Sequence, residues 1–97
     1  MQIIRSRKYQ INLLIILGYI AKDKISASKN FQQELDKLIT NIPNFPYKHK
    51  QSIYFDDKNI RDLIYKKYTI NYEVNSEENT IEILNIFNQN KPQVNQI

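Results

Sequence analysis

Few residues in this chain can move protons or hold charge at a reaction centre. The single histidine, His49, stands in the basic segment "YKHK", Arg61 opens a later apolar segment, and Lys66 and Lys67 are adjacent. A histidine titrates near neutral pH, so His49 can act as acid or base, and the three cations can stabilise a developing phosphorane. The simpler interpretation of His49, which we favour, is a solvated loop residue.

Arg61 has two interpretations that the sequence does not separate. As a binding residue it can contact phosphate, an acidic target or a partner protein. As a sheet residue it can form a cross-strand ion pair, for which the candidates are Asp62, Glu73 and Glu82. The pair Lys66–Lys67 is expected in a solvated hairpin turn, where a residue other than glycine needs a mildly strained backbone.

The remaining polar residues do not predict a metal or cofactor site. Asp56–Asp57 and Glu77–Glu78 are adjacent pairs, whose side chains diverge or lie on loops instead of clamping an ion. The 97 residues include no cysteine, which excludes disulfides and thiolate ligands. Tyr68 and Tyr72 can stack on bases, but we expect them in the core of the domain.

Two helices and a strand are predicted from the first half of the chain. The apolar pair at 3–4 indicates an N-terminal strand. Apolar residues at three- and four-residue steps predict a helix over 8–23, buried over much of its circumference. A second helix is expected over 27–41, capped by Asp23 or Ser26, and the short linker predicts an antiparallel hairpin.

Three strands are predicted from the second half. They cover 60–66, 68–74 and 80–87, and the middle one alternates apolar and polar residues with period two. The helix hairpin is expected to cover one face of an antiparallel sheet, which gives an α+β domain of order β-α-α-β-β-β. This single domain is expected over 1–90, with a polar tail at 91–97.

The segment "INLLIILGYIAKD", which follows the basic "RSRK", could also be a signal peptide. Its apolar run is about a dozen residues, against roughly 20 for a bilayer span, and apolar residues precede the charges. We interpret it as the inner helix and expect a cytoplasmic protein that makes no membrane contact. The hydrophobic content of 41% is enough for a folded core, and the net charge of +4 permits acidic partners.

Three segments, "GYIAKD" at 18–23, "IRDLIYKKYTINYEV" at 60–74 and "IEILNIFNQ" at 81–89, carry a family resemblance. Their order and spacing resemble the RelE/ParE superfamily of toxins from bacterial type II toxin–antitoxin pairs, over nearly the whole chain. The resemblance implies a toxin neutralised by an antitoxin whose disordered segment folds onto it, in a hetero-oligomer. RelE-like members cleave mRNA on the ribosome, whereas ParE-like members poison DNA gyrase.

Three places in the sequence favour the ParE-like branch. RelE-like ribonucleases carry arginine after the first tyrosine of the third strand and basic or histidine residues after the fourth, where this chain has Thr69 and "NQN" at 88–90. Threonine and asparagine carry no charge and supply no protons near neutral pH. Arg61 matches an arginine of ParE-like members. We therefore predict a gyrase inhibitor that acts by binding, with these target-binding candidates: Arg61, Lys66, Lys67, Asn88, Gln89, Asn90 and Lys91.

Two alternatives stay open at this point. One is a ribosome-dependent mRNA endoribonuclease with an atypical site, whose catalytic candidates are His49, Arg61, Lys66 and Lys67. The other is a degenerate family member that binds its antitoxin and harms nothing. In all three cases the basic surface predicts a small acidic antitoxin as partner.

Overall fold

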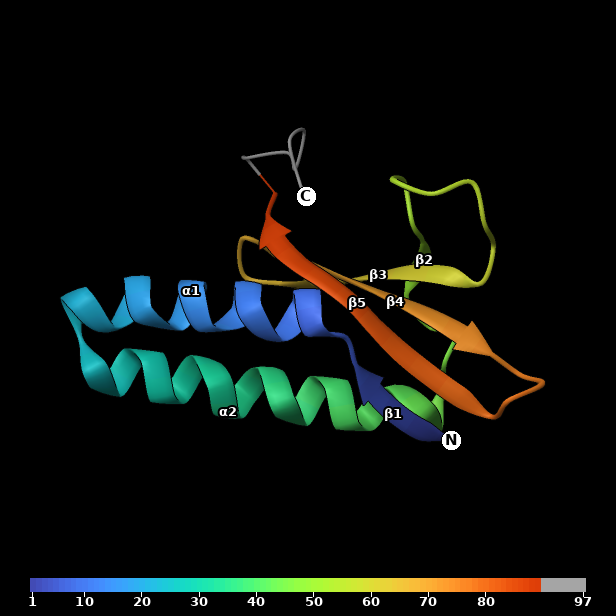
Figure 1. The fold of residues 1–97 in the computed structure, drawn as a ribbon, viewed down its shortest axis with the longest axis horizontal. Helices are drawn as coiled ribbons and strands as arrows, with labels where there is room; N and C mark the ends of the chain where they lie inside the picture. Colours follow the sequence, from blue (N-terminus) through green and yellow to red (C-terminus); the bar gives the residue numbers. More distant parts are fainter. Residues whose placement is uncertain (90–97) are drawn as a thin grey trace.

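The fold comes from a computed structural model that describes residues 1–89 (Figure 1). The expected order of one strand, two helices and three strands is confirmed, with one two-residue strand added before the last three. The elements are β1 (Gln2–Arg5), α1 (Arg7–Asp23), α2 (Ile25–Asn41), a 3-10 turn η1 (Ile42–Asn44), β2 (Lys50–Gln51), β3 (Ile60–Tyr65), β4 (Tyr68–Asn75) and β5 (Thr80–Asn88). The predicted tail at 91–97 lies outside the described residues.

The two helices begin in different ways. The Ser6 hydroxyl oxygen caps α1 by accepting a hydrogen bond from the backbone N–H of Tyr9 at 3.0 Å. The N-cap of α2 is Lys24, whose side chain makes no capping bond, so the expected cap at Asp23 or Ser26 is wrong. The single residue that joins the two helices is Lys24, and a lysine ammonium group has no acceptor for the free N–H groups of the helix end.

The sheet is mixed, with strand order β1-β5-β4-β3-β2. Strands β2 to β5 pair antiparallel, as predicted, whereas β1 pairs parallel to β5 with Gln2 opposite Thr80 and Arg5 opposite Ile83. The expectation of a wholly antiparallel sheet is therefore wrong for one strand. Parallel strands need a long connection, and the helix hairpin together with β2 to β4 provides it between β1 and β5.

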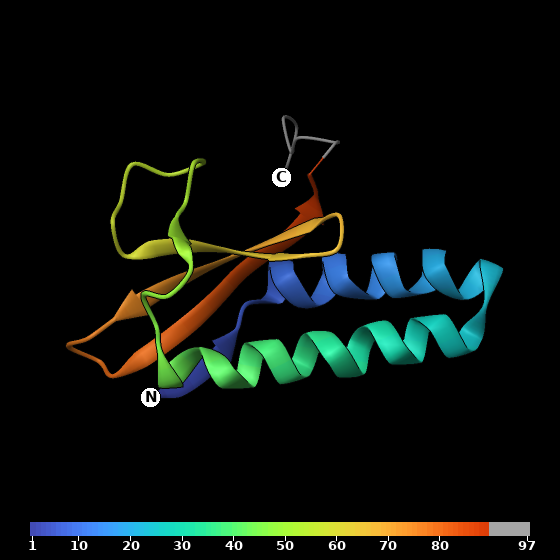
Figure 2. The same ribbon diagram turned by 180° about the vertical axis from the view of Figure 1, so that it is seen from behind.

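The core lies between one face of the sheet and the helix hairpin (Figures 1 and 2). Tyr72 is fully buried and Tyr68 packs partly buried against the core, which confirms the expectation for both tyrosines. The hairpin extends well beyond the sheet at the end where α1 turns into α2 (Figure 2). The buried apolar residues include Tyr9, Leu13, Phe31, Leu35, Ile39, Leu63, Ile70, Ile81, Ile83 and Ile86.

Helix α1 buries only one side. The expectation that it is buried over much of its circumference is wrong, because large apolar side chains of α1 lie in solvent. In a two-layer fold a helix has neighbours on one side only, here the sheet and α2. Within the described residues no helix is long and apolar enough to cross a membrane.

Candidate functional site

Lys66 and Lys67 form the two-residue turn between β3 and β4, as predicted. Lys66 has a φ of 55°, in the left-handed region that favours glycine, which confirms the expected strain. Its ammonium nitrogen lies 5.5 Å from the centroid of the Tyr65 ring, within reach of a cation–π contact. The Lys67 carbonyl accepts a hydrogen bond from the backbone N–H of Gln89 at 2.8 Å, which ties the turn to the end of β5.

This turn borders an open cleft of about 280 Å³ at the distal half of the helix hairpin, which we call the tip cleft. Its apolar floor comes from both helices and from β4, and its rim carries the two lysines. Three candidates predicted from the sequence, Lys66, Lys67 and Asn88, therefore lie together at one place. The lining residues are Ile20, Ala27, Phe31, Lys66, Lys67, Tyr68 and Asn88.

Aromatic contacts hold the floor of the tip cleft. The Phe31 ring packs against Tyr65 and Tyr68, with centroids 5.1 and 5.3 Å away. The Tyr65 hydroxyl donates to the Glu34 carboxylate, and burial together with this bond raises the pKa of Tyr65 to about 12. Burial also raises the pKa of Tyr68. These phenols stay neutral at physiological pH, so the positive charge of the cleft comes from its lysines.

Arg61 lies at the other end of β3 and holds loops together there. Its Nε donates to the Lys58 carbonyl at 3.0 Å and its Nη1 donates to the His49 carbonyl at 3.2 Å. The guanidinium also stacks over the Tyr47 ring at 4.9 Å. Side chains alternate along a strand, so Arg61 points to the opposite face from Asp62, and it bonds backbone carbonyls instead of the carboxylates that we considered.

His49 is partly buried, so the expectation of a fully solvated histidine is wrong. Its ring packs edge-on against Tyr72, with centroids 6.0 Å apart. Burial, helped by the charge of Lys48, lowers the pKa of His49. The Tyr72 hydroxyl donates to the Pro46 carbonyl at 2.5 Å, and burial raises the pKa of Tyr72 to about 12. His49 and Tyr72 therefore belong to the packing of this end of the sheet.

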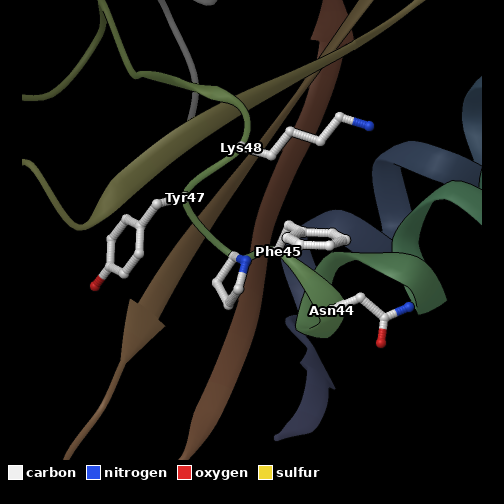
Figure 3. A pocket seen from close by; sticks show the side chains of 5 residues that line it. Asn44, Phe45, Tyr47 and Lys48 are labelled. Atoms are coloured by element: carbon white, nitrogen blue, oxygen red, sulfur yellow. The ribbon is translucent and has the colours of Figure 1, made fainter.

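The segment before His49 borders a second hollow, of about 560 Å³, shown in Figure 3. Phe45 and Tyr47 are exposed, and Figure 3 shows their side chains turned to opposite sides of the chain. Bases that stack on a protein need aromatic faces aligned along one path. These two rings do not offer such a path.

The catalytic candidates are not brought together. Positions 61 and 66 are five residues apart on an extended strand, which places Arg61 and Lys66 roughly 16 Å from each other at about 3.3 Å per residue. His49 lies at the Arg61 end. Acid–base catalysis needs its groups within hydrogen-bond reach of one reacting atom. This arrangement does not supply that geometry.

The sheet face opposite the core is also poor in cations, and α1 reaches its edge, where the Asn12 side-chain amide donates to Asn85 Oδ1 at 2.6 Å. Cross-strand neighbours on this face form four rows, and along the described strands the basic residue in them is Lys50, at the edge. The rows are Lys50, Asp62, Asn71 and Asn85; Ile60, Glu73, Glu82 and Ile4; Ile64, Thr69 and Phe87; and Asn75, Thr80 and Gln2.

In the first row the Asp62 carboxylate accepts from the Asn71 side-chain amide at 2.6 Å and from the Ile53 N–H at 3.2 Å. Its oxygens are thus used inside the fold. Tyr54 covers Phe87 of the third row edge-on, at 5.0 Å between ring centroids. Residues 1–89 contain no cluster of three or more His, Cys, Asp or Glu that could hold a metal ion.

Sequence reasoning missed the helical part of the tip cleft. Ile20, Ala27 and Phe31 lie within the two helices predicted over 8–23 and 27–41, for which the sequence indicated no role in a site. A signal was available, because these residues lie close to the turn between the two helices, where the hairpin outreaches the sheet. The candidates Asn90 and Lys91 lie outside the described residues.

Two helices on a five-stranded mixed sheet, with a cationic cleft at one end, define a small α+β domain of the RelE/ParE-like fold. Among solved structures, the chain resembles one titled "Chromosomal ParDE TA system from P. aeruginosa", with a TM-score of 0.71 and 15% identity over 91% of this chain and 95% of that one. It also resembles a conserved hypothetical protein from Helicobacter pylori, with a TM-score of 0.51 and 16% identity over 93% and 96%. The curated proteins give no match.

The amino-acid sequence identifies the family of the chain. The family described as "ParE toxin of type II toxin-antitoxin system, parDE" matches residues 3–92. The chain belongs to this family of ParE toxins.

Proposed function

We propose that this chain is the toxin of a type II toxin–antitoxin pair, that it inhibits DNA gyrase by binding, and that a cognate antitoxin neutralises it in a hetero-oligomer in the cytoplasm. The family membership supports the toxin assignment. The observation that carries the choice of binding over turnover is the tip cleft, where two exposed lysines stand over an apolar floor.

The tip cleft has the features of a protein-binding site. An apolar floor accepts a buried side chain of the target, and the lysine rim favours a neighbouring carboxylate or phosphate. The turn at Lys66, whose φ is positive, places both lysines at the end of the β3–β4 hairpin. Besides the lysines, the titratable residue in the described lining is Tyr68, whose pKa is raised by burial, so the lining holds no histidine or carboxylate as a general base. This supports binding of the target over its cleavage.

The endoribonuclease alternative has less support. It needs His49, Arg61 and the lysine pair at one reaction centre, whereas they occupy opposite ends of β3. Arg61 is also engaged with two backbone carbonyls. A protein that only binds its antitoxin keeps the same fold, so the functional test must include this outcome.

The test is to add the purified chain to a gyrase supercoiling assay and, separately, to translating ribosomes with labelled mRNA. We expect inhibition of supercoiling and intact mRNA. Codon-positioned cuts without an effect on gyrase would overturn the proposal in favour of the ribonuclease, and inactivity in both assays would favour the degenerate family member.

The antitoxin is tested by co-expressing the product of the adjacent reading frame. We expect a stable complex that no longer inhibits gyrase. The net charge of +4 predicts an acidic partner, so the complex should weaken as ionic strength rises. A partner that binds equally well at low and high salt would contradict this part of the proposal.

A further inference from the structure

Helix α1 carries a stripe of large apolar side chains in solvent. Ile11 is 47% exposed, Leu14 69%, Ile15 65% and Tyr19 71%. They recur at three- and four-residue steps, so they lie along one side of the helix, away from the core. Single apolar residues on a surface are ordinary, but a contiguous stripe indicates a surface that another molecule covers.

The only glycine of the chain lies in this stripe. Gly18 is in the interior of α1, where glycine is less favourable than any residue except proline. It has no positive φ, and a Cβ at this position would meet nothing within 4 Å. Neither backbone conformation nor internal packing therefore requires glycine, which leaves close approach by another molecule as the physical reason.

The stripe has the spacing of a helix–helix seam. Lys8, Ile11, Ile15, Gly18 and Lys22 follow one another at steps of three, four, three and four residues, which is the heptad pattern of two packed helices. We call these five residues the α1 seam. At 1.5 Å per residue it is about 21 Å long, and Leu14 and Tyr19 flank it.

The positive charges of the α1 seam indicate which kind of molecule can bind to it. A second copy of the chain packed antiparallel would place Lys8 opposite Lys22, and a parallel copy would place each lysine opposite itself. Both arrangements bring like charges together, which costs affinity. A helix with carboxylates at both ends and apolar residues between them is complementary to the seam in charge and in length.

We propose that the α1 seam docks an amphipathic helix of the antitoxin, about four turns long, with acidic residues facing Lys8 and Lys22 and a side chain seated against Gly18. The inference rests on the proposed function for the identity of the partner. The tip cleft lies at the same end of the helix hairpin as the C-terminal end of the seam, but Ile20 of its lining is on the opposite, core-facing side of α1. An antitoxin chain that continues past this end must pass round α1 to reach Lys66 and Lys67.

The first test is Gly18→Ala, assayed with the co-expressed product of the adjacent reading frame. Alanine should raise the Tm of the free chain by about 4–8 °C, because it favours the helix and has room. The same change should weaken the complex about tenfold, because the methyl group occupies the space of the partner. Asn30→Ala, on the exposed side of α2, is the matched control, which should stabilise the chain and leave the affinity unchanged.

The second test changes the chemistry of the seam. Ile15→Glu should weaken the complex by at least about tenfold, and Lys8→Glu with Lys22→Glu should weaken it most at low salt. Lys29→Glu with Lys37→Glu, on exposed positions of α2, makes the same charge change elsewhere and should have a smaller effect. All five positions are exposed, so the variants should keep the fold.

The outcomes separate this inference from the proposed function. If the wild-type chain binds the product and the seam variants bind it equally well, the seam is not the docking site, while the toxin–antitoxin pairing stands. If the wild-type chain does not bind it, the pairing fails and the inference with it. A concentration-dependent dimer that Ile15→Glu abolishes would make a second copy the occupant and overturn the proposal.

Discussion

The two ends of β3 carry similar charges in different situations. At one end the Arg61 guanidinium donates to two loop carbonyls and stacks on Tyr47. At the other end Lys66 and Lys67 stand in solvent at the rim of a cleft, with Lys66 in a strained conformation. One cationic group stabilises the fold, and the other is available to a partner.

This difference shows that the surrounding loops decide whether a charged side chain can contact a partner molecule. Arg61 is needed to hold the segments that contain Lys58 and His49, because their carbonyls receive its hydrogen bonds. The β3–β4 turn is closed by backbone bonds and by the strands themselves, so its side chains are left for other contacts. Substitutions at the two ends should therefore separate stability from function.

Replacement of Arg61 tests the structural end. Arg61→Ala removes two charged hydrogen bonds and one stacking contact, and with partial exposure taken into account it should lower the free energy of unfolding by about 2 kcal/mol. Urea denaturation measures this loss. Inhibition of gyrase, corrected for the folded fraction, should stay at the wild-type level. A variant that remains as stable as wild type but no longer inhibits would assign Arg61 to the binding surface.

Charge reversal at the turn tests the binding end. Lys66→Glu with Lys67→Glu should leave the free energy of unfolding within about 0.5 kcal/mol, because surface substitutions rarely cost more. Inhibition of supercoiling should weaken about tenfold or more, which corresponds to about 1.4 kcal/mol of binding. The control is Lys48→Glu with Lys58→Glu, an equal charge change near Arg61. Equal losses in both pairs would show that net charge matters and that the cleft does not.

The fold was largely predictable because its signals are local. The alternation of β4 and the three-to-four periodicity of α1 and α2 follow from which side of each element is buried. The parallel pairing of β1 was not predictable in this way, since four residues of strand do not specify a partner. The missing cap of α2 depends on a one-residue linker, which the sequence pattern did not reveal.

The candidate site was predictable only in part. The lysine turn could be placed from the sequence, because the two predicted strands follow each other so closely that the chain must reverse at the lysine pair. The role of Arg61 could not, because it depends on carbonyls at Lys58 and His49 that reach it through loop structure. The floor of the tip cleft depends on how far the helix hairpin outreaches the sheet, which is a tertiary property.

A glycine at the turn separates strain from function at the binding end. Lys66→Gly relieves the positive φ of 55°, which should stabilise the chain by up to about 1 kcal/mol, offset in part by the greater freedom of glycine in the unfolded state. Inhibition of gyrase should weaken, because one cation is lost. Thermal unfolding and the supercoiling assay measure the two effects. A variant that is more stable and inhibits as well as wild type would remove Lys66 from the binding surface.

Lowering the pH should destabilise the Arg61 end of β3 first, and we expect this to be the smallest effect of the four predictions in this Discussion. Burial lowers the pKa of His49 in the folded chain, so below about pH 6.5, its ordinary pKa, the unfolded state binds this proton more readily. Stability should therefore fall as the pH falls from 7 to 5, and His49→Gln should make this dependence less steep in urea titrations. Lys66→Gly should keep the wild-type dependence, because it leaves His49 and Tyr72 in place. An unchanged dependence in His49→Gln would show that protonation of His49 does not disturb its packing on Tyr72.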